Sequence, residues 1–234
     1  MISIKYIPPE WGFGNRILYY NNLRQLAKKE NVNWSCIPWE GSNHFLSLTP
    51  PCNTGDWDLK PCLGEMFFGY HSIPTRDIFE FTQAVKSDGK KRAAVHFRGG
   101  DFHQWNIDAV LSSDYYLDAV KLIENEVDEF LIFTDDESLK SYNDVEIYFE
   151  DKGIAYDIGD NLREDYIGDF KKMTDCDYII SSPSTYNICA GFIGKHKKII
   201  HSQEWIDNRV KVNDKFWVDL NNGGNDDYSI WRLV

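Results

Sequence analysis

The stretch RAAVHFRGGDF, residues 92–102, decides the fold. Its first six residues, RAAVHF, are mostly apolar and predict a buried strand. The turn that follows holds Arg98, Gly99, Gly100 and Asp101. A buried strand that ends in a polar glycine turn is typical of parallel α/β sheets, in which ligands bind beyond the carboxyl ends of the strands.

Strands and helices alternate from this stretch to residue 202. The pattern predicts further strands at EFLIFTDD, IAYDIG, DYIISSPS and KKIIHS, with helices at SSDYYLDAVKLIENEV, ESLKSYNDV, REDYIGDFKKMTDC and TYNICAGFIG. Such alternation favours a parallel sheet with helices on both of its faces.

The amino-terminal part opens in the same way. ISIKYIP predicts a strand, GFGNR a glycine turn, and the residues from Ile17 onward a helix, as at the start of a Rossmann-like unit. Residues 33–75 show no period and are interpreted as loops and short elements, and a helix is predicted at residues 74–87. The expected domains are residues 1–88 and residues 89–234, each a Rossmann-like half.

The composition and net charge of the chain limit the classes of function that it can have. The chain has 234 residues, of which 42% are hydrophobic and 26% charged, as in globular proteins. A net charge of -12 argues against a nucleic-acid partner, because binding to a phosphate backbone needs a basic face. An acidic chain can still bind a small phosphate-containing molecule at a local cationic site.

Cysteines and the amino terminus bear on location. The five cysteines are an odd number without a C-x-x-C pair, which disfavours a metal site of the zinc type. They are either free thiols of a reducing compartment or include a Cys52–Cys62 bridge. The amino terminus resembles neither a signal peptide nor a membrane anchor, so we expect a cytoplasmic protein without membrane insertion.

Four polar clusters fall at the predicted ends of strands: GFGNR, HFRGGD, TDDES and SSPST. In the first, Gly12 and Gly14 precede a helix. They either let backbone N–H groups approach an anion or form an ordinary tight turn.

The second cluster is more specific. Arg98 can bind a phosphate through two hydrogen bonds, and the glycines beside it leave room for a ligand. Strand alternation puts His96 and Arg98 on one side, with Phe97 turned away. The alternative is a structural ion pair between Arg98 and Asp101.

The third and fourth clusters offer acids and hydroxyls. Asp135 and Asp136 either bind a metal or, as we favour for at least one of them, cap a helix or order a loop. Ser184 and Thr185 precede a predicted helix, where capping and phosphate binding are compatible roles.

These clusters, in this order, resemble those of the fucosyltransferase superfamily, which includes alpha-1,2-, alpha-1,6- and protein O-fucosyltransferases. GFGNRILYYNNLRQLAKK is similar to the opening of the alpha-1,2 family, and VHFRGGDF resembles the H-x-R-R-x-D motif. FTDDESL resembles the acidic second motif, and DFKKMTDCDYIISSPSTYNICAGFIG resembles the third. The similarity extends from Trp11 to Gly194, apart from residues 34–76.

The resemblance implies a GT-B fold, in which two Rossmann-like halves face each other across a cleft. Residues 1–88 would then be the acceptor side, and residues 89–234 would bind the nucleotide sugar. The resemblance also implies GDP-fucose as donor substrate, a glycan acceptor, and no cofactor or metal. In the site that the resemblance implies, Arg98 binds the beta-phosphate, and Ser184 and Thr185 bind the diphosphate. His96 and Asp169 lie near the guanine, and Asp135 also belongs to the donor site. The phosphate side is lined from the other half by Gly12, Gly14 and Asn15, and Asp101 braces the Arg98 loop.

The sequence departs from the family pattern at Gly99, which replaces the second arginine of H-x-R-R. The family forms alpha-fucosides with inversion, which calls for a base, and the candidates are Asp101 and His103. Three alternatives remain: the same fold with another GDP-sugar, a non-catalytic binding module, and a doubly wound domain whose polar strand ends are ordinary loops.

Overall fold

The protein was examined as a computed structural model, which describes residues 2–4, 6–45, 78–81, 88–159, 165–211 and 231–233. The chain divides into two compact units, Met1–Ala84 and Val85–Val234.

The first unit is built on one strand–helix–strand motif. β1 (Ile2–Ile4) leads into α1 (Phe13–Lys29), and β2 (Trp34–Cys36) returns to pair with β1 in parallel. A 3-10 helix, η1 (Glu40–Asn43), follows. The last turn of α1 is basic, and cations there interact favourably with the helix dipole.

Aromatic rings fill the core of the first unit. The ring of Tyr20 lies 5.6 Å from that of Trp39 and 6.0 Å from that of Phe79, and Phe45 lies 5.2 Å from Phe79. All four side chains are buried. Aromatic residues of the segment 33–45 thus contribute to hydrophobic packing.

Two expectations from the sequence concern residues that lie partly or wholly outside the described ranges. The helix predicted at residues 74–87 is wrong for residues 78–81, where Phe81 instead forms an antiparallel bridge with Phe45. The rest of that helix and the Cys52–Cys62 pair lie outside the described residues. The described cysteines, Cys36, Cys176 and Cys189, are buried free thiols.

The second unit alternates strands and helices. Its elements are β3 (Arg92–Phe97), α3 (Phe102–Trp105), η2 (Ile107–Ala109), α4 (Ser113–Lys121), β4 (Glu129–Thr134), α5 (Lys140–Lys152), β5 (Tyr156–Ile158), α6 (Tyr166–Asp175), β6 (Tyr178–Ile180), α7 (Thr185–Ile193), β7 (Lys198–His201), α8 (Gln203–Lys211) and β8 (Trp231–Leu233).

The strands form a six-stranded sheet in the order β5-β4-β3-β6-β7-β8, and every pair is parallel. Counted along the chain, this is the order 3-2-1-4-5-6 of Rossmann sheets. Val95 of β3 stands opposite Ile132 of β4 and Ile180 of β6, so β3 lies at the centre. The predicted α/β class and parallel sheet are confirmed.

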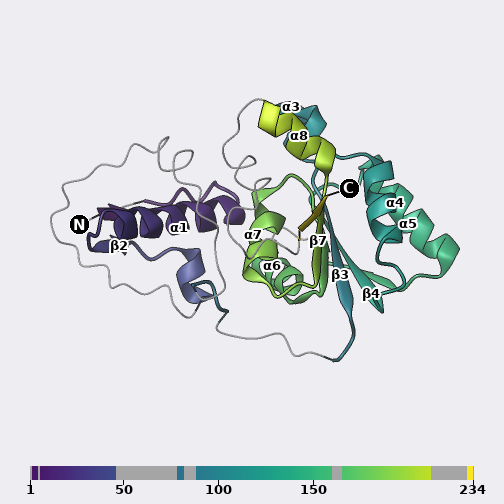
Figure 1. The fold of residues 1–234 in the computed structure, drawn as a ribbon, viewed down its shortest axis with the longest axis horizontal. Coiled ribbons are helices and arrows are strands. Elements are labelled where there is room, and N and C mark those ends of the chain that lie inside the picture. Colours follow the sequence, from purple (N-terminus) through teal and green to yellow (C-terminus); the bar gives the residue numbers. More distant parts are fainter. Residues whose placement is uncertain are drawn as a thin grey trace. The chain divides into compact units, whose positions relative to one another are not determined.

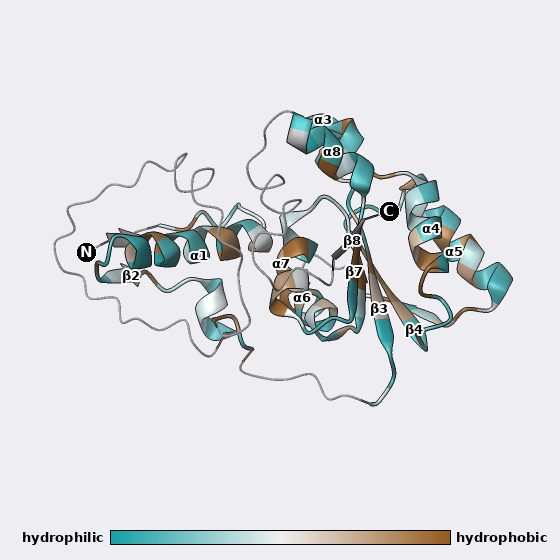
Figure 2. Cartoon of the chain, in the orientation of Figure 1, coloured by the Kyte–Doolittle hydropathy of each residue, from teal (hydrophilic) through white to brown (hydrophobic). Residues whose placement is uncertain are grey.

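Helices cover both faces of this sheet. Figure 1 shows α4 and α5 together on one side, with α6 and α7 on the other. Hydrophobic residues are concentrated in the strands and in the helices that pack on them, α7 among them (Figure 2). None of the helices that the structure describes has the length and hydrophobicity to cross a membrane.

Alternation along β3 sorts its side chains between these two layers. Ala93, Val95 and Phe97 belong to the core that α4 and α5 cover. The ring of Phe97 lies 4.2 Å from that of Tyr116 on α4. His96, between Val95 and Phe97, points to the opposite layer, where it meets α7. The one polar side chain in the carboxyl half of β3 therefore faces the α6–α7 layer.

Candidate functional site

The site begins where the strand order reverses. From β3 the chain proceeds through β4 to β5 on one side, and β6 starts the series on the other side. In open α/β sheets, ligands bind beyond the carboxyl ends of the strands at this switch point. Here the two flanking ends are the Arg98 loop, which follows β3, and the segment Ser181–Ser184, which leads from β6 into α7.

Arg98 directly follows β3, and its guanidinium is held by two carboxylates. Its Nη2 donates to Oδ1 of Asp101 at 2.5 Å, and its Nη1 lies 2.6 Å from Oδ2 of Asp135. The guanidinium also lies 4.8 Å from the ring centre of Phe102. Its Nε is buried and has no hydrogen-bond partner among the described residues. The site thus contains a fixed cation with one donor still unused.

Two acids that follow β4 shape the same loop. Oδ1 of Asp135 accepts a hydrogen bond from the Gly99 N–H at 2.9 Å. Oδ1 of Asp136 accepts the hydroxyl of Ser138 at 2.6 Å, which is the main cause of a lowered pKa of Asp136. Both acids therefore hold the nearby backbone in a fixed conformation. In the described residues no three His, Cys, Asp or Glu side chains gather as metal ligands would.

The two glycines do not leave room for a ligand, as the sequence led us to expect. A Cβ added to Gly99 would lie 2.8 Å from Oδ2 of Asp136, and one added to Gly100 would lie 2.5 Å from Oδ2 of Asp135. Gly100 also has a φ of +41°, which favours glycine. The glycines are required because the acids approach the loop so closely. A second arginine in place of Gly99 would therefore meet Asp136.

His96 lies in a buried polar network at the switch point. Its Nδ1 is 2.8 Å from Oγ of Ser182 and 2.7 Å from Nδ2 of Asn187, while Oδ1 of Asn187 accepts the hydroxyl of Ser181. Burial, and secondarily the charge of Arg98, lowers the pKa of His96 to about 3. The imidazole is therefore neutral at physiological pH.

The tautomer of His96 follows from its neighbours. Asn187 can only donate through its Nδ2, so Nδ1 of His96 accepts and the proton lies on Nε2. No described residue hydrogen-bonds to that Nε2. A neutral N–H donor, fixed in orientation, is suited to a carbonyl or ring-nitrogen acceptor of a ligand.

Asp169 lies on α6, near Tyr186, which His96 also approaches. The Tyr186 ring is 5.7 Å from that of His96, and the charge of Asp169 contributes, after burial, to a raised pKa of Tyr186. Asp169 is itself buried, and Lys172 lies 3.4 Å from its Oδ1. The structure thus brings both His96 and Asp169 near the side chain of Tyr186.

Ser184 and Thr185 lie where α7 begins. Ser184 is the N-cap, and its Oγ accepts the Tyr186 N–H at 3.4 Å. Thr185 is the first helical residue. Both lie on the segment that leaves β6, beside the strand that carries Arg98.

His103 and Asp101 lie on the short helix after the Arg98 loop. The His103 side chain is 44% exposed, and its Nε2 is 3.4 Å from Oδ2 of Asp136. Asp101 is more exposed and forms the ion pair with Arg98 that the sequence offered as an alternative to phosphate binding.

The remaining expected residues belong to the first unit, at the start of α1. Gly12 is the exposed N-cap, and a Cβ there would meet no atom within 4 Å. Gly14 is buried and Asn15 half-buried in the first turn. Arg16, one residue on, forms an ion pair with Glu40 at 2.6 Å.

Sequence reasoning assigned no role to four residues of this site: Ser181 and Ser182, which belong to the SSPST cluster, and Tyr186 and Asn187. A signal was present for Asn187 as well. Asn187 is a single amide in the otherwise apolar helix TYNICAGFIG, and an amide inside a buried helix needs partners. Comparison of the chain with protein families, with curated proteins and with solved structures finds no match.

Proposed function

We propose that the chain is an inverting glycosyltransferase that moves L-fucose from GDP-fucose to a glycan hydroxyl and forms an alpha-fucoside without a metal. One observation carries the proposal. Arg98, His96 and the start of α7 all lie at the switch point of a sheet with the strand order 3-2-1-4-5-6.

The donor is assigned to these groups by their chemistry. A diphosphate needs a cation and oriented N–H donors, which Arg98 and the amino end of α7 provide. A base with a carbonyl edge matches the neutral N–H of His96, and an amino edge matches the carboxylate of Asp169. This combination favours guanine.

In the proposed reaction the acceptor oxygen attacks the anomeric carbon, while the bond from that carbon to the beta-phosphate oxygen breaks. GDP leaves with the electron pair. Negative charge grows on the diphosphate in the transition state, and Arg98 stabilises it there more than in the ground state.

The proton of the acceptor hydroxyl needs a base. Asp101 is occupied by Arg98 at 2.5 Å, whereas His103 is exposed and has a carboxylate, Asp136, beside its Nε2. A histidine oriented by an acid is a common form of general base. We therefore assign the proton to His103 and the bracing of the Arg98 loop to Asp101 and Asp135.

The first unit has a role in the same proposal. It would carry the acceptor, and Gly12, Gly14 and Asn15 would close the phosphate side of the donor, as in a GT-B enzyme. The similarity of GFGNRILYYNNLRQLAKK to the opening of the alpha-1,2 family supports this role.

The test is calorimetric titration of the full chain with GDP and with UDP in EDTA. We expect GDP to bind, UDP to bind more weakly, and Arg98→Ala to abolish GDP binding and to lower turnover with GDP-fucose by about 100- to 1000-fold.

Arg92→Ala is the matched control. Arg92 lies at the other end of β3, is similarly exposed, and also pairs with two acids, Asp88 and Glu129. GDP binding that is equal in both variants would contradict the proposal.

A second candidate is a non-catalytic binding module of the same fold. It is favoured by the two carboxylates that already occupy Arg98. Weak or absent GDP binding, together with no turnover on any of a panel of glycan acceptors, supports this candidate. Turnover with GDP-mannose in place of GDP-fucose supports another GDP-sugar.

A further inference from the structure

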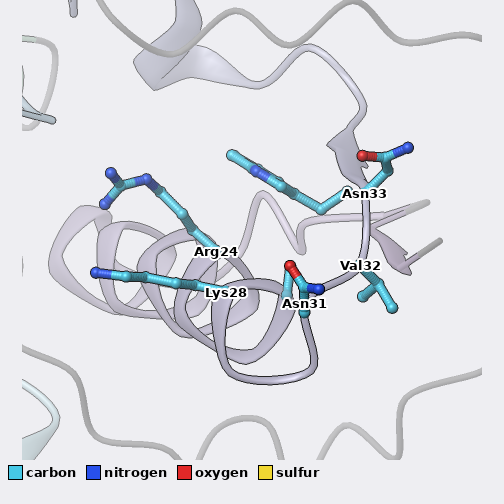
Figure 3. Close-up of a pocket in the computed structure, with 7 residues that line it drawn as sticks. Arg24, Lys28, Asn31, Val32 and Asn33 are labelled. Atoms are coloured by element: carbon cyan, nitrogen blue, oxygen red, sulfur yellow. The ribbon is translucent and has the colours of Figure 1, made fainter.

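A second candidate site lies in the first unit, at the opposite end of α1 from Gly12, Gly14 and Asn15. The end of α1 and the turn into β2 line an open pocket of about 320 Å³. Figure 3 shows Arg24 and Lys28 extended side by side from α1, with Asn31, Val32 and Asn33 on the turn that follows. Trp34, the first residue of β2, also lines the cavity.

The charge of this cavity is unbalanced. Arg24 and Lys28 are four residues apart on α1, so they lie on the same face, and like charges at this spacing destabilise a helix. Neither has an ion pair or a side-chain hydrogen bond with any described residue. Lys28 lies in the last turn, where it offsets the helix dipole, but Arg24 lies before that turn. An anion between the two side chains would relieve their repulsion.

The other lining groups suit a ring with hydroxyls. The indole of Trp34 packs edge to face on Tyr20, with ring centres 5.3 Å apart, and so is held in place. Asn31 and Asn33 each offer a donor and an acceptor. The backbone φ of Asn31 is +50°, which places this amide on a tight left-handed turn beside the cavity.

Size restricts the ligand further. Ligand pockets usually span roughly 300–1,000 Å³. A cavity of about 320 Å³ lies at the small end of this range and matches one sugar ring with one charged substituent.

We propose that Arg24, Lys28, Asn31, Asn33 and Trp34 form a binding site for an anionic monosaccharide, with the phosphate or carboxylate between Arg24 and Lys28 and the ring against Trp34. The site does not depend on the function proposed for the second unit. The net charge of the chain is negative, so attraction of an anion to this site has to come from the nearby charges of Arg24 and Lys28 and not from the overall charge of the protein.

The test is calorimetric titration of the full chain at low salt with glucose 6-phosphate, glucuronate, glucose and inorganic phosphate. We expect at least one of the two sugar anions to bind, and glucose to bind about tenfold more weakly or not at all. Glucose 6-phosphate and glucuronate distinguish a phosphate source from a carboxylate source.

The variant Arg24→Gln/Lys28→Gln should weaken binding of the sugar anion by about tenfold or more. Lys29→Gln is the matched control, because it removes one charge from the same helix end without lining the cavity, and its affinity should stay within about twofold of the wild type. The double variant should also unfold at no lower temperature than the wild type, because the repulsion is gone.

Three results would overturn this site. They are the absence of binding by both sugar anions, equal binding by the double variant and the wild type, and binding of inorganic phosphate as tight as that of glucose 6-phosphate. The last result would show anion binding without recognition of the ring.

Discussion

Asp135 binds both the side chain of Arg98 and the backbone of the residue after it. Its Oδ2 lies 2.6 Å from Nη1 of Arg98, and its Oδ1 accepts the Gly99 N–H at 2.9 Å. One carboxylate at the end of β4 therefore fixes both the charge and the conformation of the loop that follows β3.

Asp135→Ala should loosen this loop. The variant loses a partly exposed ion pair and leaves the Gly99 N–H without its acceptor, so we expect the free energy of unfolding to fall by about 1–2 kcal/mol. GDP affinity should fall with it, because Arg98 is no longer held. Urea unfolding and calorimetry measure the two effects.

Asp144→Ala, which removes the exposed pair with Lys140 on α5, is the control and should change stability by less than about 0.5 kcal/mol. Equal losses in both variants would contradict this role of Asp135.

Asn187→Ala should be more costly. Asn187 is fully buried and bonds His96, Ser181 and Ser182. Each buried polar group left unsatisfied costs about 1–3 kcal/mol, so we expect a loss of about 3 kcal/mol in chemical unfolding. Asn143→Ala, on the exposed side of α5, should lose less than about 0.5 kcal/mol. A small loss for Asn187→Ala would mean that water replaces the amide.

Two buried histidines predict a pH dependence of stability. Burial lowers the pKa of both His96 and His201 to about 3, so both are neutral in the folded protein at pH 5 and above. In the unfolded chain they take up protons below about pH 6.5. The unfolded state then binds more protons, and stability falls as the pH falls below about 6.5.

The quantity to measure is the slope of the free energy of unfolding against pH. Well below pH 6.5 each histidine contributes about 1.4 kcal/mol per pH unit, and above about pH 5 most carboxylates still keep their charge. Urea unfolding of wild type and His201→Asn between these limits should show a smaller slope in the variant. Asn keeps an acceptor for the Ser202 N–H, which His201 Nδ1 accepts at 2.8 Å. Identical slopes would show that His201 is protonated in the folded state.

Gly99→Ala tests the crowding around the loop. Its Cβ would lie within 2.9 Å of Asp136 and of Leu139, so we expect a loss of about 1–3 kcal/mol in thermal unfolding. Gly12→Ala is the control, because its Cβ would meet open space and its φ is -55°. If Gly99→Ala is as stable as the control, the acids move aside easily, and a second arginine at this position would be tolerated.

The strand–helix alternation could be predicted because each strand of the second unit is a short apolar run between polar turns. The helix predicted at ESLKSYNDV is instead α5, Lys140–Lys152, and ends at Gly153, whose φ of +64° stops it. The residues between ESLKSYNDV and that glycine show little helical period, so the predicted helix ended too early. β8 was missed because a strand of only three residues, Trp231–Leu233, is too short to show a pattern of its own.

The site was predictable only in part. Residues on one strand or one turn, such as His96 and Arg98, can be related by alternation and spacing. The partners that decide their chemistry come from other elements: Asp135 lies 37 positions from Arg98, and Asn187 lies 91 positions from His96. Only the fold determines which side chains meet, so the acid that holds Arg98 and the amide that fixes the tautomer of His96 had to be read from the structure.

The edge position of β8 affects how the protein behaves if it is shortened. β8 pairs with β7, in which Ile199 and Ile200 are fully buried. Removal of Trp231–Leu233 would leave the N–H and C=O groups of an apolar strand open to pairing with another chain. Truncation of the carboxyl terminus is therefore expected to promote self-association and precipitation, so expression of shortened chains should retain these three residues.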